Sequence, residues 1–200
     1  MRLLVYDRTC VRKRGNLSSV WAAGAQLYKQ LGRVDDVKGV ASWDEALAWI
    51  VAHEEPIDEI QYWGHGKWGG ALVDDEMLDA EVTRPIHRLH VALAAVRERL
   101  ANDALVWFRC CEVLGARRGH ELAMRLADFL GARIAGHTHV IGFHQSGLHG
   151  LRPGQRPDWN ADEGLVAGTP AHPVRARMSL PWRPHTITCL HGSVPAAWFA

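Results

Sequence analysis

Short apolar runs alternate along the first 145 residues with longer stretches of helical periodicity. The runs occupy residues 3–6, 37–41, 57–63, 104–109 and part of 133–143, and their lengths are typical of strands. The run at 104–109 is almost continuously apolar, as expected for a strand buried on both faces. This alternation predicts an α/β fold in three layers, in which a mostly parallel sheet has helices on both faces.

Four segments carry signals of helices. In the first, over 19–31, the residues Val20, Gly24, Leu27 and Leu31 fall on one face, with Ser18 or Ser19 as its cap. The second begins at Ser42, and Glu45 three residues later completes a capping box. The third covers roughly 84–100, and the fourth is expected to end at Gly131, a favoured residue for a helix C-terminus.

The last quarter of the chain has a different composition. Residues 147–200 hold seven of the nine prolines and little helical periodicity. Two hundred residues are enough for one compact domain but too few for two. We therefore expect an α/β domain over 1–146 and an irregular C-terminal extension over 147–200 packed on it, with one or two strands around Ile187.

Composition narrows the range of functions. The formal net charge is +1, which predicts no general attraction to nucleic acid or acidic membranes, and the basic cluster at residues 12–14 is interpreted as solvated surface. No apolar stretch reaches the length of a membrane span, and residues 1–7 do not resemble a signal peptide. We expect a cytoplasmic protein whose four cysteines are reduced, so that a special cysteine is reactive rather than structural.

Two predicted strands end in residues that are suited to chemistry. The strand over 57–63 runs into Gly64, His65 and Gly66, and the strand over 104–109 runs into Cys110 and Cys111. Functional groups of α/β sheets gather at the carboxyl ends of the strands. If the two strands are parallel neighbours, the imidazole and a thiol lie at the same edge of the sheet.

A thiol beside an imidazole is a minimal set for acyl transfer. Because an ordinary thiol has a pKa of about 8.5, little thiolate exists at neutral pH unless a base accepts the proton. His65 is the candidate base, and it can later protonate the leaving group. The backbone amides of Gly66 and Cys111 are candidates for binding the oxyanion.

These two segments resemble motifs of the caspase-like superfamily. In that superfamily (clan CD cysteine peptidases and bacterial CHAT-type or related domains), one apolar strand ends in His-Gly and a second ends in a small residue followed by Cys. Residues 60–66 and 105–112 match these motifs, and the element order over 1–145 is compatible with the family. The resemblance implies a caspase-like fold and a His-Cys dyad that hydrolyses a protein or peptide substrate without a metal or cofactor.

Cys111 fits the expected nucleophile better than Cys110. It follows a small residue and precedes Glu112, as the nucleophile often does in CHAT-like relatives, and strand alternation lets only one of the two cysteines face His65. Trp63, Trp68 and Glu112 are the candidates for a substrate groove because they adjoin the dyad in the sequence.

Two alternatives stay open at this point. The domain is a catalytically silent interaction module, or it is a zinc-dependent hydrolase that uses His65, one of Cys110 and Cys111, and His137 or His139. No dense metal-binding signature is present, so no metal is expected. The oligomeric state and the preferred substrate are not predicted.

Overall fold

A six-stranded, mostly parallel sheet forms the centre of the molecule. We describe it from a computed structural model that covers residues 1–11 and 16–199, so the basic cluster at 12–14 lies outside the described residues. The strand order is β10-β8-β7-β3-β1-β2, with every neighbouring pair parallel except β10 and β8. Its strands are β1 (Arg2–Asp7), β2 (Asp36–Val40), β3 (Ile57–Trp63), β7 (Leu100–Arg109), β8 (Arg133–His137) and β10 (Leu148–Leu151).

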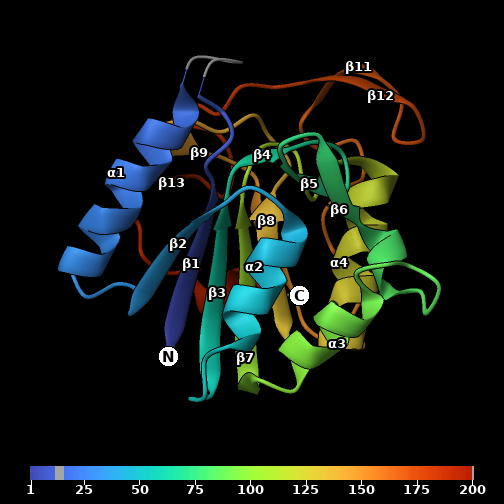
Figure 1. The fold of residues 1–200 in the computed structure, drawn as a ribbon. Helices are drawn as coiled ribbons and strands as arrows, with labels where there is room; N and C mark the ends of the chain where they lie inside the picture. Colours follow the sequence, from blue (N-terminus) through green and yellow to red (C-terminus); the bar gives the residue numbers. More distant parts are fainter. Residues whose placement is uncertain (12–15, 200) are drawn as a thin grey trace.

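Helices cover both faces of this sheet, which confirms the expected α/β class. On one face lie α2 (Trp43–Val51), α3 (His90–Arg97) and α4 (Ala116–Leu130), and on the other lies α1 (Leu17–Gln30) (Figure 1). The second face is completed by the C-terminal segment, whose Ile187, Val194 and Trp198 pack against β7 and β10. The sheet is thus the middle of three layers.

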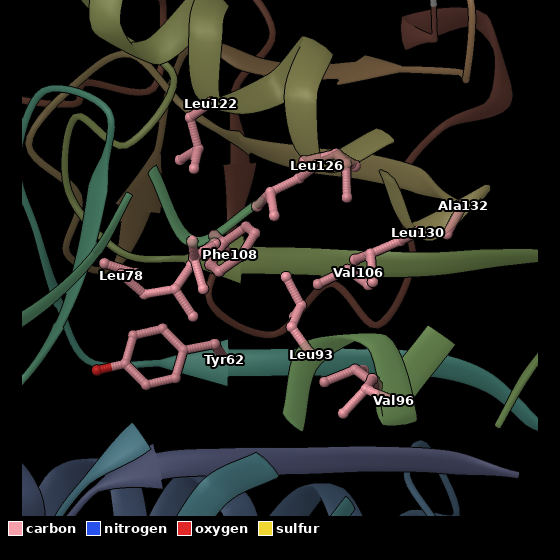
Figure 2. Packing of buried hydrophobic residues seen from close by; sticks show 14 of the residues in the cluster. Tyr62, Leu78, Leu93, Val96, Val106, Phe108, Leu122, Leu126, Leu130 and Ala132 are labelled. Atoms are coloured by element: carbon pink, nitrogen blue, oxygen red, sulfur yellow. The ribbon is translucent and has the colours of Figure 1, made fainter. Parts of the chain in front are cut away.

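Strand alternation determines which residues enter each face. Val106 and Phe108 of β7 point toward α3 and α4, where they pack with Leu93, Leu126 and other apolar side chains (Figure 2). Leu105 and Trp107, one position out of phase, face the opposite side. Because β7 lies in the middle of the sheet and is apolar on both faces, its sequence shows no alternation of apolar and polar residues.

The predicted helix signals are confirmed at two ends and corrected elsewhere. The Ser42 hydroxyl accepts from the Glu45 amide at the start of α2, and Gly131 adopts the left-handed conformation at the end of α4. The helix predicted over 84–100 was too long at both ends, because α3 begins only at His90 and Leu100 already belongs to β7. Pro85 disfavours a helical conformation at the residue before it, and Arg84 is extended.

The first helix also differs from its prediction at the N-terminus. It begins at Leu17 after Asn16, which has a left-handed backbone, so neither Ser18 nor Ser19 is the cap. Ser18 is instead buried, and its hydroxyl donates to the Asp7 carbonyl. A serine that can cap a helix is equally able to bond to a neighbouring strand.

In the part of the chain that the structure describes, three small sheets and two short 3-10 helices complete the fold. A meander of β4 (His65–Gly66), β5 (Gly70–Val73) and β6 (Glu76–Asp79) follows β3, and η1 (Ala80–Thr83) comes after it. The other elements are β9 (His144–Gln145), β11 (Leu165–Gly168), β12 (Pro173–Ala176), β13 (Ile187–Thr188) and η2 (Ala196–Trp198). β13 pairs with β9 and supplies the strand expected around Ile187, whereas the β11–β12 hairpin was not anticipated. Within the described chain, no helix combines the length and the apolar character that a membrane crossing requires.

Candidate active site

The ends of β3 and β7 bring the two predicted motifs together. The strands are parallel neighbours, with Trp63 opposite Arg109, so the residues that follow leave the sheet side by side near β4 (Figure 1). His65 and Cys111 line one cavity of about 390 Å³ at this edge. The cavity lies between the sheet, α1 and the segments at 141–145 and 189–190. Topology therefore joins a histidine and a cysteine that are distant in the sequence.

Strand alternation separates the two adjacent cysteines. Cys110 is fully buried and belongs to the core cluster beneath α4, together with Val113 and Leu122. Cys111 points to the other face and is partly exposed in the cavity. Of these two thiols, only that of Cys111 lines the cavity with His65.

The Cys111 thiol lies against the backbone of Ile141. The Ile141 amide donates to its Sγ at 3.4 Å, and Sγ lies 3.9 Å from the Ile141 carbonyl oxygen. Burial raises the pKa of Cys111. The hydrogen bond from the Ile141 amide partly offsets this rise, and the nearby Glu112 carboxylate raises the pKa further. A thiol in such surroundings is protonated at neutral pH and needs a base before it can attack a carbonyl.

His65 makes a contact that the sequence did not indicate. Its Nε2 lies 3.3 Å from the Sγ of Cys10, which follows the end of β1, and its ring meets the edge of Trp21 on α1 with the centroids 5.2 Å apart. β1 is the sheet neighbour of β3, so a residue after β1 approaches one after β3. Cys10 is therefore a third side chain of the site, recognisable from the sequence only once the strand order is known.

Gly66 lies in β4, directly beside the two cysteines. Lys67 and Gly70 exchange both backbone hydrogen bonds. The next pair along the β4–β5 ladder, Gly66 and Ala71, is therefore a pair without hydrogen bonds between its members. The Gly66 amide thus points away from β5. A Cβ on Gly66 would lie 2.6 Å from the Cys111 carbonyl oxygen and 2.7 Å from the Cys110 Sγ. Glycine is thus required here by the close approach of β4 to the cysteines, and not by a tight turn.

Only one of the three predicted groove residues lines the cavity. Trp63 does so, with its ring packed under α1 beside Tyr28. Trp68 is buried against Ala116 and Ala176, away from the cavity, because the β4–β5 turn directs it toward the start of α4. Glu112 lies in a separate shallow depression with Lys67, and burial raises its pKa. It follows Cys111 in a turn and has a left-handed backbone, with φ 56°.

A buried arginine forms the deep wall of the cavity. The Arg109 guanidinium donates to Gln145 at 2.9 Å, to the Tyr28 hydroxyl at 2.7 Å and to the carbonyls of Cys189 and His191 at 3.1 Å. It also lies over the Trp107 ring at 4.4 Å from the centroid. Burial lowers the pKa of Arg109. These bonds join β7 to α1 and to the C-terminal segment.

The zinc ligand set is not assembled. Over residues 1–11 and 16–199, no three His, Cys, Asp or Glu side chains are grouped closely enough to hold a metal ion. His137 is fully buried and its Nδ1 contacts the Ser146 carbonyl at 3.2 Å, whereas His139 contacts the Thr138 hydroxyl.

Comparison with protein-family models, with curated proteins and with solved structures gave no match for this chain. The assignment of a function therefore depends on the geometry of the cavity.

Proposed function

We propose that this protein is a cysteine-dependent amide hydrolase with a caspase-like fold that acts on a protein or peptide in the cytoplasm. The observation that carries the proposal is the presence of His65 and Cys111 in one cavity at the carboxyl ends of two adjacent parallel strands. The mostly parallel sheet with helices on both faces and the placement of the two motifs agree with the arrangement that the resemblance implies.

The chemistry follows from the surroundings of each group. Because burial keeps the Cys111 thiol protonated, His65 accepts its proton as Sγ attacks the carbonyl carbon, and a C–S bond forms while the carbonyl oxygen gains negative charge. The Gly66 and Cys111 amides stabilise that oxygen. The C–N bond then breaks, His65 protonates the departing amine, and water hydrolyses the thioester with His65 again as base.

Cleavage of a peptide library is the direct test. We expect the wild type to cleave a subset of peptides, and the variants Cys111→Ala and His65→Ala to lose at least 100-fold in rate, since a general base contributes about 10²–10⁴. Cys189→Ser is the matched control, because Cys189 lines the same cavity and has no catalytic role in the proposal. Equal cleavage by Cys111→Ala and wild type would overturn it.

Alkylation by iodoacetamide at pH 7 tests the pairing independently of substrate. With peptide mapping, we expect Cys111 to react several times faster in the wild type than in His65→Ala, because the imidazole accepts the thiol proton. Equal rates in the two proteins, or a faster reaction at Cys10 than at Cys111, would show that His65 does not activate Cys111.

A binding domain without turnover is the second candidate function. The observation in its favour is that burial raises the pKa of Cys111 while the His65 Nε2 contacts Cys10 rather than Cys111. This candidate predicts that no peptide is cleaved and that Cys111→Ala leaves the biological activity intact.

A further inference from the structure

The apolar stripe of α1 is directed into the cavity and toward solvent. Val20 and Leu27 keep 63% and 41% of their surface exposed although they lie at helical spacing, whereas the residues of α1 that are buried are Ser18, Ala25 and Tyr28. An apolar stripe of a surface helix normally packs on the core. The exposure of such a stripe beside a cavity is typical of a surface that binds a ligand or another protein.

The rest of the cavity mouth has the same character. Phe143 and Leu190, on the two segments opposite α1, are 59% and 49% exposed and line the cavity with Val20 and Leu27. Farther in, the wall is formed by Trp21, Trp63 and Tyr28. A volume of about 390 Å³ lies within the range of small-ligand pockets, which is about 300–1,000 Å³.

The charges of the cavity argue against a charged occupant. Among the described residues that line it, none is an aspartate or glutamate, so a lysine or arginine side chain would find no counter-ion. Arg109 is the one arginine or lysine among the described lining residues. It is 4% exposed, and its guanidinium donors already bond to Gln145, Tyr28 and two backbone carbonyls. An acidic side chain would have to displace these bonds.

We propose that the cavity binds a large apolar side chain, such as that of leucine or phenylalanine, on the substrate residue next to the bond that Cys111 attacks. The assignment of the attacked bond rests on the proposed function, whereas the apolar occupant follows from the lining alone. The thiol and the imidazole lie in the cavity wall with the apolar side chains, so a side chain held there places its own carbonyl beside Cys111.

Peptidyl acyloxymethyl ketones that differ only in the residue beside the ketone test the preference. We expect those with Leu or Phe to alkylate Cys111 at least tenfold faster than those with Ala, Asp or Lys, measured as second-order rate constants by mass spectrometry. A tenfold difference in rate corresponds to about 1.4 kcal/mol, which the burial of a large apolar side chain is able to supply.

Two substitutions on α1 provide a matched pair. Leu27→Trp narrows the cavity and is expected to abolish the preference for the Leu and Phe ketones over the Ala ketone. Leu31 lies one turn farther along, is 54% exposed and is not among the residues that line the cavity. The variant Leu31→Trp should therefore keep the preference for the Leu and Phe ketones. Circular dichroism checks that both variants are folded. Loss of the preference in both or in neither contradicts the proposal.

A protection assay separates this proposal from the proposed function. N-acetyl-phenylalaninamide should protect Cys111 from iodoacetamide in the wild type but not in Leu27→Trp, and N-acetyl-aspartamide should not protect it. Protection without peptide cleavage would support the apolar binding site and contradict the proposed hydrolase activity. Peptide cleavage together with equal alkylation rates for the five ketones would support the hydrolase activity and contradict the apolar binding site.

Discussion

At the scale of single residues, Arg109 connects three parts of the chain that are distant in sequence. Its guanidinium bonds to Tyr28 of α1, to Gln145 of β9 and to the carbonyls of Cys189 and His191, and its planar fork suits several acceptors at once. A buried charge of this kind is tolerated because its donors are satisfied. The Arg109 side chain therefore holds together the segments that form the cavity wall.

Replacing that side chain measures this dependence. We expect Arg109→Lys to lower the free energy of unfolding by about 2–3 kcal/mol, because an ammonium cannot reach all the acceptors and leaves some of them buried without a donor. Urea denaturation followed by tryptophan fluorescence gives the value. Arg97→Lys, on the surface of α3, is the control and should change stability by less than about 0.5 kcal/mol. Equal stabilities of the two variants would show that the bonds of Arg109 contribute little.

At the scale of elements, the position of α1 over the sheet depends on a glycine. A Cβ on Gly24 would lie 2.8 Å from Cζ3 of Trp63, which is closer than non-bonded carbon atoms approach one another in proteins. The helix thus rests directly on the Trp63 ring, which itself forms part of the cavity wall.

Gly24→Ala separates packing from helix propensity. Alanine favours a helix over glycine by about 1 kcal/mol, but here we expect a net destabilisation of about 1–3 kcal/mol, because α1 must move off Trp63. Thermal unfolding monitored by circular dichroism checks the sign. Gly142→Ala, where a Cβ meets nothing within 4 Å, should be close to neutral. A stabilised Gly24→Ala protein would show that α1 is free to shift.

The same helix illustrates what periodicity can predict. The spacing of Val20, Gly24, Leu27 and Leu31 correctly indicates a helix with an apolar face. Whether that face lies on the core or lines an open cavity depends on what is opposite it, and the segments opposite α1 come from residues 141–145 and 189–190. Local sequence contains no record of such distant partners.

At the scale of the whole molecule, Glu163 of the C-terminal extension contacts both the residue that follows β8 and a histidine of β10. The Glu163 carboxylate accepts from the Thr138 hydroxyl at 2.9 Å and lies 2.8 Å from Nε2 of His149 on β10. Burial opposes the ionisation of Glu163, but the bonds with His149 and Thr138 outweigh it and lower its pKa. Nearby, burial lowers the pKa of His139 and takes that of His137 to about 3.

These shifts predict a loss of stability in acid. His137 titrates near pH 6.5 when unfolded and near 3 when folded, so its contribution is fully present above about pH 6.5 and is lost as the pH falls toward 3. We expect the free energy of unfolding to fall by about 1 kcal/mol per pH unit between pH 6 and 5. His137→Asn should reduce this slope, whereas His172→Gln on the surface should not. A slope that is the same in wild type and His137→Asn would contradict the assignment.

The sequence by itself determined the α/β class, the bounds of β3, the start of α2 and the end of α4, because these depend on periodicity and capping within one segment. Alternation also indicated that Cys111 and not Cys110 lies on the side of His65, and Cys111 is the one that lines the cavity. Only the tertiary structure decided that Cys10 contacts His65, that Trp68 and Glu112 lie away from the cavity, and that Arg109 forms its wall. Each of these depends on strand order or on pairing between segments far apart in the chain, and no short-range pattern encodes such pairings.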